Sequence, residues 1–197
     1  MPRIIIGITG GISAYRIPDL AGALIKNGWE IKVVMTEAAK KFITPLTMAT
    51  LAKGPIYDDN SEWAADGVIK HIELGKWLKD QATDMLVIAP ATANTIAKMA
   101  KGIADNLLSS LYLARLPDTR VVIFPAMNTR MWENDMTQKH IARLRHRSFH
   151  KVVDPEVGLL ACGDVGIGKL PSVRTIVTEI EGHRHFATEL PKKTDNG

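Results

Sequence analysis

Unbroken apolar runs of strand length recur along this chain, with enough sequence between them for a helix. A strand with one wet face alternates apolar and polar residues, so unbroken runs are typical of strands buried on both faces. Parallel sheets bury their strands in this way, because helical crossovers cover both faces. The sequence therefore predicts an α/β fold in three layers, a doubly wound parallel sheet between two layers of helices. The runs cover residues 4–8, 31–35, 85–89, 121–124 and, more weakly, 152–153.

Helical patterns separate these runs. The first pattern ends at Gly28, where a left-handed residue can stop a helix, and Pro18 lies early enough to belong to a first turn. A later pattern is interrupted near Gly102, which predicts two helices there. We expect one domain over residues 1–181 and a polar, disordered tail over 182–197. The predicted helical stretches are 14–26, 36–53, 95–115, 131–147 and 175–181.

Size and composition limit the class of protein. The chain has 197 residues, of which 46% are hydrophobic, and can therefore bury one core. No apolar run approaches the roughly 18 residues of a membrane span, and the N-terminus enters the first strand without a signal-peptide pattern. We expect a soluble, cytoplasmic protein. Cys162 is the only cysteine, which excludes an intrachain disulfide and a cysteine cluster for zinc.

The charge pattern argues against nucleic-acid binding. The formal net charge is +4, and the excess is concentrated at Arg143, Arg145, Arg147 and the tail, as in a solvated helix face and a frayed end. A nucleic-acid interface needs a continuous basic stripe or a reading motif, and the sequence has neither. A mildly basic surface is compatible with an anionic small-molecule substrate.

The segment PAMNTRMW at 125–132 follows the apolar run 121–124 and changes abruptly from hydrophobicity to specific chemistry. Ligands of open α/β sheets bind beyond the carboxyl ends of the strands. At that position the segment offers the amide of Asn128, the thioethers of Met127 and Met131, and an indole. A binding site lined by these side chains predicts a flat, mostly apolar ligand with one polar group that the amide can bind.

The glycine-rich segment GITGGIS at 7–13 closes the first strand and opens the first helix. Free backbone N–H groups and the positive helix end make an anion site there, although the segment is neither a Walker A loop nor a strict GxGxxG fingerprint. The hydroxyls of Thr9, Ser13 and Thr36 suit a terminal monophosphate and favour FMN over NAD. Glu37 lies near where the ribose-binding acid of an NAD site would fall. A tight turn that needs glycine for steric reasons alone is the other interpretation.

The segment PATANT at 90–95 follows the run 85–89 at the same edge of the sheet. Its small residues let a ring or a ribityl chain approach the backbone, and Thr92, Asn94 and Thr95 can form hydrogen bonds to it. The same string also suits a helix cap. Its position opposite the glycine-rich segment favours the binding role.

Two further side chains carry chemistry if they reach this edge. His71, in HIELGKW, can take a proton near neutral pH, although a lone histidine is more often structural; Ile72 and Leu74 beside it are expected to face inward. Cys162 lies in the glycine-punctuated segment 160–171, which predicts a mobile flap, although most cysteines are packed as small hydrophobes. No second ligand lies at helical spacing from His71, so we expect no metal site.

Together these segments resemble the flavin-containing cysteine decarboxylases over about residues 3–181. The most specific matches are HIELGKW, PATANT, PAMNTRMW and ACGDVGIGKLP. The resemblance implies a Rossmann-like subunit that binds FMN near a subunit interface, in a homotrimer or a multiple of trimers such as a dodecamer. The residues expected to bind FMN are Thr9, Gly10, Gly11, Ser13, Thr36, Pro90, Thr92, Ala93, Asn94, Thr95 and Met127.

The resemblance also implies a reaction and residue roles. In the branch that serves coenzyme A biosynthesis, FMN oxidises the cysteinyl thiol of 4′-phospho-N-pantothenoylcysteine, carbon dioxide leaves, and the resulting enethiolate is reduced to 4′-phosphopantetheine. His71 matches the active-site base, Asn128 the amide that holds the substrate carboxylate, and Met131 a methionine that shapes the pocket. Cys162 matches the flap cysteine that protonates the enethiolate. The expected substrate-binding residues are Asn128, Met131, Ala161 and Lys169.

Other members of the same family suggest alternatives. The lantibiotic peptidyl-cysteine decarboxylases stop at the enethiol and lack the flap cysteine, so Cys162 favours the coenzyme A branch. Regulatory relatives that bind phosphatases carry long acidic extensions or lack part of the catalytic set, and this chain does neither. Many bacterial relatives are fused to a phosphopantothenoylcysteine synthetase, so a separate synthetase is expected here. Lys169 stands where arginine is expected, which keeps the charge but loses the planar fork.

Overall fold

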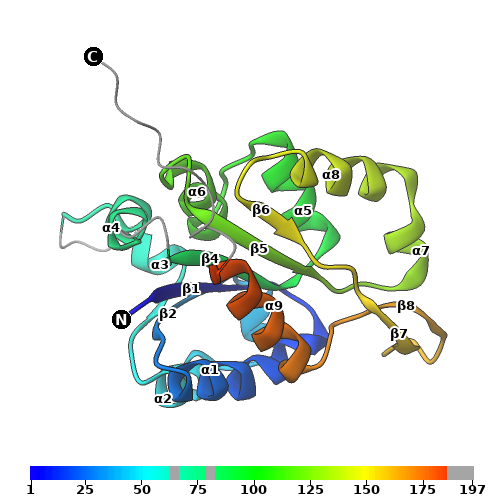
Figure 1. The fold of residues 1–197 in the computed structure, drawn as a ribbon, viewed down its shortest axis with the longest axis horizontal. Helices are drawn as coiled ribbons and strands as arrows, with labels where there is room; N and C mark the ends of the chain where they lie inside the picture. Colours follow the sequence, from blue (N-terminus) through cyan, green and yellow to red (C-terminus); the bar gives the residue numbers. More distant parts are fainter. Residues whose placement is uncertain (63–66, 79–82, 186–197) are drawn as a thin grey trace.

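The computed structural model describes residues 1–62, 67–78 and 83–185. Its centre is a six-stranded parallel sheet in the order β3-β2-β1-β4-β5-β6, with helices on both faces (Figure 1). This is the strand order of dinucleotide-binding Rossmann folds, so the predicted doubly wound α/β class is confirmed. The strands of this sheet are β1 (Arg3–Ile8), β2 (Glu30–Met35), β3 (Ile56–Tyr57), β4 (Met85–Ala91), β5 (Arg120–Pro125) and β6 (His150–Val152). A separate antiparallel hairpin consists of β7 (Glu156–Leu159) and β8 (Val165–Lys169).

Local sequence signals explain where the helices begin and end. Pro18 lies in the first turn of α1, as predicted. The predicted stretch 36–53 is instead a short 3-10 helix followed by α2, which begins at Pro45 with Thr44 as its N-cap. Gly102 ends α5 with φ of 76°, which confirms the predicted break. The helices are η1 (Ile12–Arg16), α1 (Ile17–Lys26), η2 (Ala39–Lys41), α2 (Pro45–Ala52), α3 (Asp59–Glu62), α4 (Lys70–Trp77), α5 (Ala93–Lys101), α6 (Leu107–Ala114), α7 (Thr129–Glu133), α8 (Asp135–Arg145) and α9 (Val173–His185).

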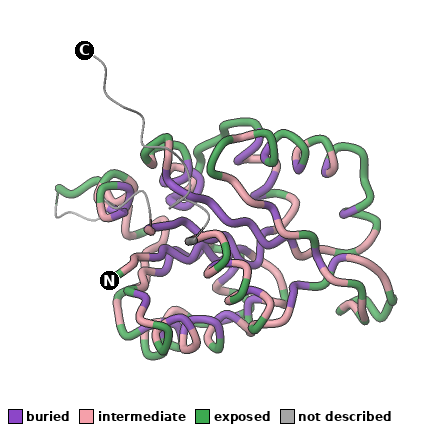
Figure 2. Tube along the Cα trace, viewed as in Figure 1, coloured by how far each residue is buried: buried purple, intermediate pink, exposed green. Residues whose placement is uncertain are grey.

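Side chains of the central strands alternate between two hydrophobic cores, and Figure 2 shows the strands buried between the helical layers. Ile4, Ile6 and Ile8 pack with α1, α2 and α9, whereas Ile5 packs with α4, α5, α6 and α8. All four isoleucines are completely buried. Full burial of one such side chain stabilises the fold by roughly 1.5–3 kcal/mol relative to exposure. The unbroken apolar run in β1 therefore holds both helical layers on the sheet.

Two predictions near the C-terminus need correction. The weak run at 152–153 belongs to a strand that begins earlier, at His150. Helix α9 continues to His185, so residues 182–185 are helical and the prediction of disorder there is wrong. The rest of the predicted tail, 186–197, lies outside the described residues. Within the described ranges, no helix has the length and the apolar composition to cross a membrane.

Candidate active site

A cavity of about 940 Å³ opens beyond the carboxyl ends of β1, β2, β4 and β5. The order of the strands reverses between β1 and β4, and ligands of open α/β sheets bind at such a switch point. The volume lies near the upper end of the range of small-molecule sites, about 300–1,000 Å³, which leaves room for a cofactor beside a substrate. The predicted site residues that line this pocket are Thr9, Gly10, Gly11, Ser13, Thr36, Thr92, Ala93, Asn94, Thr95, Met127, Asn128, Met131, Ala161, Cys162 and Lys169.

The hydroxyl of Thr9 joins two loops at the base of the pocket. It donates to the carbonyl oxygen of Pro90 at 2.6 Å and accepts from the backbone N–H of Thr92 at 3.0 Å. Thr9 is 1% exposed, so its polar group is fully used inside the chain. Thr9 and Pro90 therefore position the binding loops, and the prediction that the Thr9 hydroxyl suits a bound phosphate does not fit this geometry.

Two adjacent glycines at the start of the first helix serve different purposes. A Cβ on Gly10 would overlap the Cβ of Ala38, so Gly10 lets the loop pack against the turn after β2. Gly11 has an extended backbone with φ of −155°, and a Cβ there would meet nothing closer than the Thr92 methyl at 4.0 Å. Neither backbone strain nor internal packing requires glycine at 11. Its missing side chain instead keeps the backbone open to the pocket, as an anion held by N–H groups requires.

The other polar groups near this end of the pocket are partly used within the fold. Thr36 donates to the carbonyl oxygen of Ile8 at 3.3 Å and accepts from the N–H of Ala39 at the same distance. Glu37, the residue that suggested an NAD ribose, is 59% exposed and forms an ion pair of 2.6 Å with Lys40. Helix α5 begins at Ala93 behind its N-cap Thr92, so both interpretations of PATANT, a helix cap and a pocket wall, apply together.

The turn after β5 places Asn128 in the pocket lining. Asn128 is the N-cap of α7, and its side-chain oxygen accepts from the N–H of Met131 at 2.8 Å. The oxygen is thereby occupied, which leaves the NH₂ donors of the amide for the pocket. Donors of this kind suit a carboxylate. Met127 and Met131 line the pocket beside it.

The flap, defined here as residues 156–169, packs closely on this turn. Gly168 has φ of 145°, and its carbonyl oxygen accepts from the N–H of Met127 at 3.0 Å. A Cβ on Gly168 would overlap the Met127 carbonyl oxygen, and one on Gly166 would overlap the Thr129 hydroxyl. The two glycines therefore allow β8 to lie directly against the turn that carries Asn128.

The ends of the flap are held by two side chains. Arg16, in η1, donates to the carbonyl oxygens of Leu170 at 3.0 Å and Pro171 at 3.2 Å. Glu156 at the other end accepts from the N–H of Ser172 at 3.3 Å. Because η1 follows directly on the glycine-rich segment, Arg16 links the two sides of the pocket.

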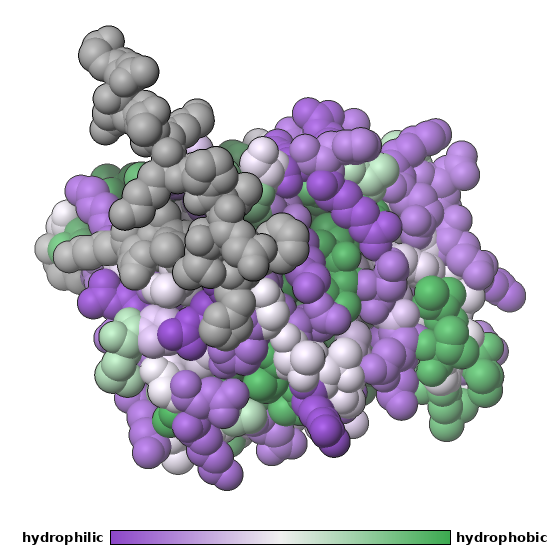
Figure 3. Space-filling model, viewed as in Figure 1, coloured by the Kyte–Doolittle hydropathy of each residue, from purple (hydrophilic) through white to green (hydrophobic). Residues whose placement is uncertain are grey.

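Cys162 lies in the loop between β7 and β8 and lines the pocket as an exposed free thiol. Its sulfur donates to the Oδ2 atom of Asp164 at 3.5 Å. Val157, Leu159 and Val165 of the same hairpin are between 67% and 76% exposed. Figure 3 shows hydrophobic surface gathered over β7 and β8. The thiol is thus carried on an apolar, solvent-facing element.

His71 is the one predicted catalytic residue that lies outside the pocket lining. It belongs to α4, where Glu62 accepts its backbone N–H at 3.0 Å and also contacts its Nδ1 atom. Leu74 faces inward as predicted, but Ile72 is 37% exposed because the segment is a helix rather than an alternating strand. The histidine is thus held by a carboxylate and does not line the cavity of its own chain.

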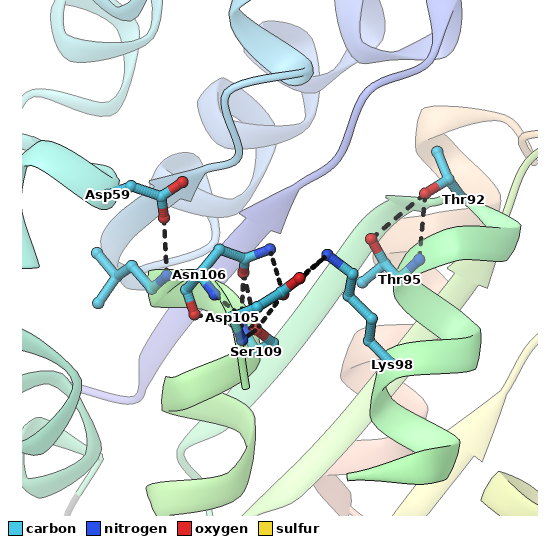
Figure 4. Close-up of polar contacts among 8 residues, drawn as sticks. Asp59, Thr92, Thr95, Lys98, Asp105, Asn106 and Ser109 are labelled. Carbon is cyan, nitrogen blue, oxygen red and sulfur yellow. Dashed lines mark hydrogen bonds and ion pairs between the residues drawn. The ribbon is translucent and has the colours of Figure 1, made fainter. Parts of the chain in front are cut away.

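Among the pocket residues that the sequence reasoning missed are Asp59, Lys98, Asp105 and Asn106. They connect α3, α5 and α6 at one end of the pocket (Figure 4). The available signal was a capping box, in which Asn106 and Ser109 satisfy each other's backbone N–H groups at the start of α6. Across the described part of the chain, no group of three or more His, Cys, Asp or Glu side chains forms a candidate metal site.

A family model described as Flavoprotein matches residues 1–185. The chain belongs to the flavoprotein family. Among relatives, it is 42% identical over 179 residues to a probable phosphopantothenoylcysteine decarboxylase of Streptococcus mutans, covering 91% of this chain and 97% of the relative. It is 45% identical over 168 residues to a coenzyme A biosynthesis bifunctional protein of Vibrio vulnificus, covering 85% of this chain but 40% of that protein.

Solved structures of flavoproteins have the same fold. A cysteine-to-serine mutant of PPC decarboxylase, complexed with pantothenoylaminoethenethiol, has a TM-score of 0.81 and 30% identity, covering 91% of this chain and 96% of the other. The FMN binding protein AtHal3 has a TM-score of 0.79 and 30% identity, covering 96% and 98%. The Rossmann-like class inferred from the resemblance is thereby confirmed.

Proposed function

We propose that this chain is an FMN-dependent carboxy-lyase that converts 4′-phospho-N-pantothenoylcysteine to 4′-phosphopantetheine in coenzyme A biosynthesis. The observation that carries the proposal is the single pocket that joins the glycine-rich segment, the Asn128 turn and the Cys162 flap. The streptococcal relative supports the same activity, because its name specifies this decarboxylase and the match covers nearly its whole length.

FMN fits the open end of the pocket. The backbone at Gly10, Gly11 and Ser13 would hold its phosphate, and the small residues from Thr92 to Thr95 would lie along its ribityl chain and ring. The structural similarity to an FMN binding protein supports this choice over NAD. When bound, FMN supplies a two-electron acceptor for the substrate thiol and returns the electrons later, so the overall reaction has no net oxidation.

Asn128 would hold the carboxylate that is lost. Its NH₂ donors face the pocket because its oxygen is occupied by the N–H of Met131. A neutral donor grips the carboxylate without adding a charge that would resist the departure of carbon dioxide. Met131 would pack against the carbon chain of the substrate beside it.

Cys162 would donate the proton that completes the product. The thiol lies on the flap among apolar side chains, which exclude water when the flap closes. Its S–H donates to the carboxylate of Asp164, and the substrate would replace that carboxylate as the acceptor. Lys169 and Ala161 lie on the same element and would contact the rest of the substrate.

His71 would act in the pocket of a neighbouring copy within a homotrimer or a multiple of trimers. In its own chain it lies outside the pocket, while the adjacent side chains Val68, Ile69 and Ile72 are exposed and hydrophobic. An apolar rim around an oriented histidine suits a subunit interface. We place the assembly in the cytoplasm with the other soluble enzymes of this biosynthesis.

The test is turnover by the purified, FMN-loaded protein. Incubation with phosphopantothenoylcysteine should give phosphopantetheine and carbon dioxide, detected by mass spectrometry. The variant Cys162→Ser should still release carbon dioxide but accumulate the unsaturated enethiol, whereas Ser148→Ala, remote from the pocket, should behave as the wild type. Flavin-loaded protein that decarboxylates only peptides ending in cysteine, or nothing, would refute the proposal.

A further inference from the structure

An ion pair in the pocket wall has no part in the reaction described above. Lys98 Nζ lies 2.8 Å from both carboxylate oxygens of Asp105, and both residues line the pocket (Figure 4). The Lys98 side chain is 18% exposed and that of Asp105 is 52% exposed. The positive partner is thus the more enclosed of the two.

The geometry of α5 explains how Lys98 reaches the pocket. Its backbone lies near the end of the helix, where its carbonyl accepts from Gly102 at 2.8 Å and from Ile103 at 3.0 Å. Helical side chains point back toward the N-terminus, so the ammonium extends toward the pocket end marked by Thr95. The side chain thereby brings its ammonium to the pocket lining, although the backbone of Lys98 lies near the far end of α5.

The fold fixes the carboxylate partner as well. Asp105 accepts from the side chains of Ser109 and Asn106 at 3.4 Å each, at the start of α6. The hydrogen bond from Lys98 lowers the pKa of the Asp105 carboxyl, so Asp105 stays ionised near neutral pH. An ammonium has three donors, and in the described part of the chain Lys98 directs two at Asp105, which leaves one N–H for a bound molecule.

We propose that Lys98 tunes the bound flavin by stabilising its reduced, anionic form, and that Asp105 positions Lys98 and limits this effect. The inference rests on the proposed binding of FMN in this pocket. The oxidised flavin ring is neutral, whereas the two-electron reduced ring is an anion at neutral pH. A cation in the pocket wall therefore favours the reduced state, and a neighbouring carboxylate opposes it.

This balance matters because the proposed reaction uses the flavin first as an electron acceptor and later as an electron donor. A more stable reduced form assists the oxidation of the substrate thiol and hinders the later return of electrons. A cation partly neutralised by its own carboxylate gives an intermediate driving force, which serves both half-reactions. Asp105 is the positioning residue in this scheme, since it acts through Lys98.

The experiment measures the midpoint potential of bound FMN by anaerobic spectroscopic titration, without substrate. Lys98→Met should weaken the binding of reduced relative to oxidised FMN about tenfold, which corresponds to about 30 mV in the negative direction for a two-electron couple. Asp105→Asn should shift the potential in the positive direction, because it leaves Lys98 uncompensated. The matched control is Lys101→Met, which removes an exposed lysine of the same helix outside the pocket lining and should leave the potential unchanged.

The outcomes separate the possible roles. Shifts of opposite sign in Lys98→Met and Asp105→Asn, with Lys101→Met unchanged, would support the proposal. An unchanged potential in Lys98→Met, or shifts of the same sign in both pair variants, would overturn it and leave the pair as a structural link between α5 and α6. Loss of affinity for FMN but not for riboflavin, at an unchanged potential, would also overturn it and assign Lys98 to the phosphate. A wild-type protein that binds no flavin would instead refute the proposed function itself.

Discussion

The loops at the sheet edge and the flap both line the pocket, but they are held there by different kinds of packing. The pocket floor, defined as residues 9–13 and 92–95, lies on the buried sheet, and its key hydroxyl on Thr9 is shared between two loops. The flap exposes Val157 and Val165 to solvent, and it is attached through hydrogen bonds near its ends and through the contact of β8 with the Asn128 turn. Elements with few buried contacts open at low free-energy cost. Changes in the floor should therefore affect stability and cofactor affinity, whereas changes in the flap should affect turnover alone.

The largest effect is expected where the flap meets the Asn128 turn. Gly168→Ala adds a Cβ that overlaps the Met127 carbonyl oxygen, so the flap must shift away from the substrate. Displacement of a catalytic group by about 1 Å costs on the order of a hundredfold in rate. We expect kcat to fall by about that factor while FMN affinity and the unfolding midpoint stay near the wild-type values.

Gly163→Ala is the matched control for this variant. Gly163 also has a positive φ, of 90°, but a Cβ there meets nothing within 4 Å. It carries the backbone strain without the overlap and should cost much less activity. Equal losses in the two variants would show that backbone strain, rather than close approach to the turn, governs the flap.

The complementary change in the floor is Thr9→Val. It keeps the shape of the side chain but leaves the Pro90 carbonyl and the Thr92 N–H without their buried partner. Unsatisfied buried groups cost about 1–3 kcal/mol each, so we expect a loss of about 2–3 kcal/mol in the free energy of unfolding and weaker FMN binding. Urea denaturation and quenching of flavin fluorescence measure the two effects, and Thr9→Ser should restore both. A Thr9→Val protein as stable as the wild type would show that the floor does not depend on this hydroxyl.

The same contrast explains what the sequence could predict. The apolar runs predicted the central strands because burial on both faces leaves a local signature, and strand β3, with two residues, is too short to leave one. The floor and the Asn128 turn come directly after those strands in the sequence, so their residues could be predicted as pocket residues. The β7–β8 hairpin was predicted only as a flap, since its glycines obscure the alternation of a strand.

Long-range placement could not be predicted. Lys98 and Asp105 are ordinary surface residues by type, and only the way α5 and α6 are packed brings them to the pocket. His71 was expected at the pocket, but it lies outside the pocket lining, on α4, which packs against α6. Sequence therefore identified many of the residues that line the pocket, but not how distant segments are arranged around it.

Acid should loosen the floor and the flap together, through a group remote from both. Burial, together with the charges of Arg115 and Arg147, lowers the pKa of His150 to about 4. The unfolded chain binds the proton near pH 6.5, so stability is fully present above that value and is lost as the pH falls toward 4. We expect a loss on the order of 2 kcal/mol over this window, allowing for partial exposure. His150→Gln should flatten this part of the pH profile of urea denaturation; an unchanged slope would exclude His150 as the source.

The smallest and most local change is expected for Arg16, which links floor and flap. Arg16→Ala removes the donor to Leu170 and Pro171 but leaves the backbone of the glycine-rich segment intact. Hydrogen exchange measured by mass spectrometry should become about tenfold faster in peptides covering 156–171 and stay unchanged in β1 and β4, with kcat reduced about fivefold.

Arg174→Ala, at an exposed arginine of α9 near the same end of the flap, is the control and should alter neither the exchange rate nor kcat. Faster exchange in β1 as well would mean that the flap and the floor open as one unit, and the distinction between them would not hold. Faster exchange confined to the flap would show that a single guanidinium holds the mobile wall of the pocket against the rigid one.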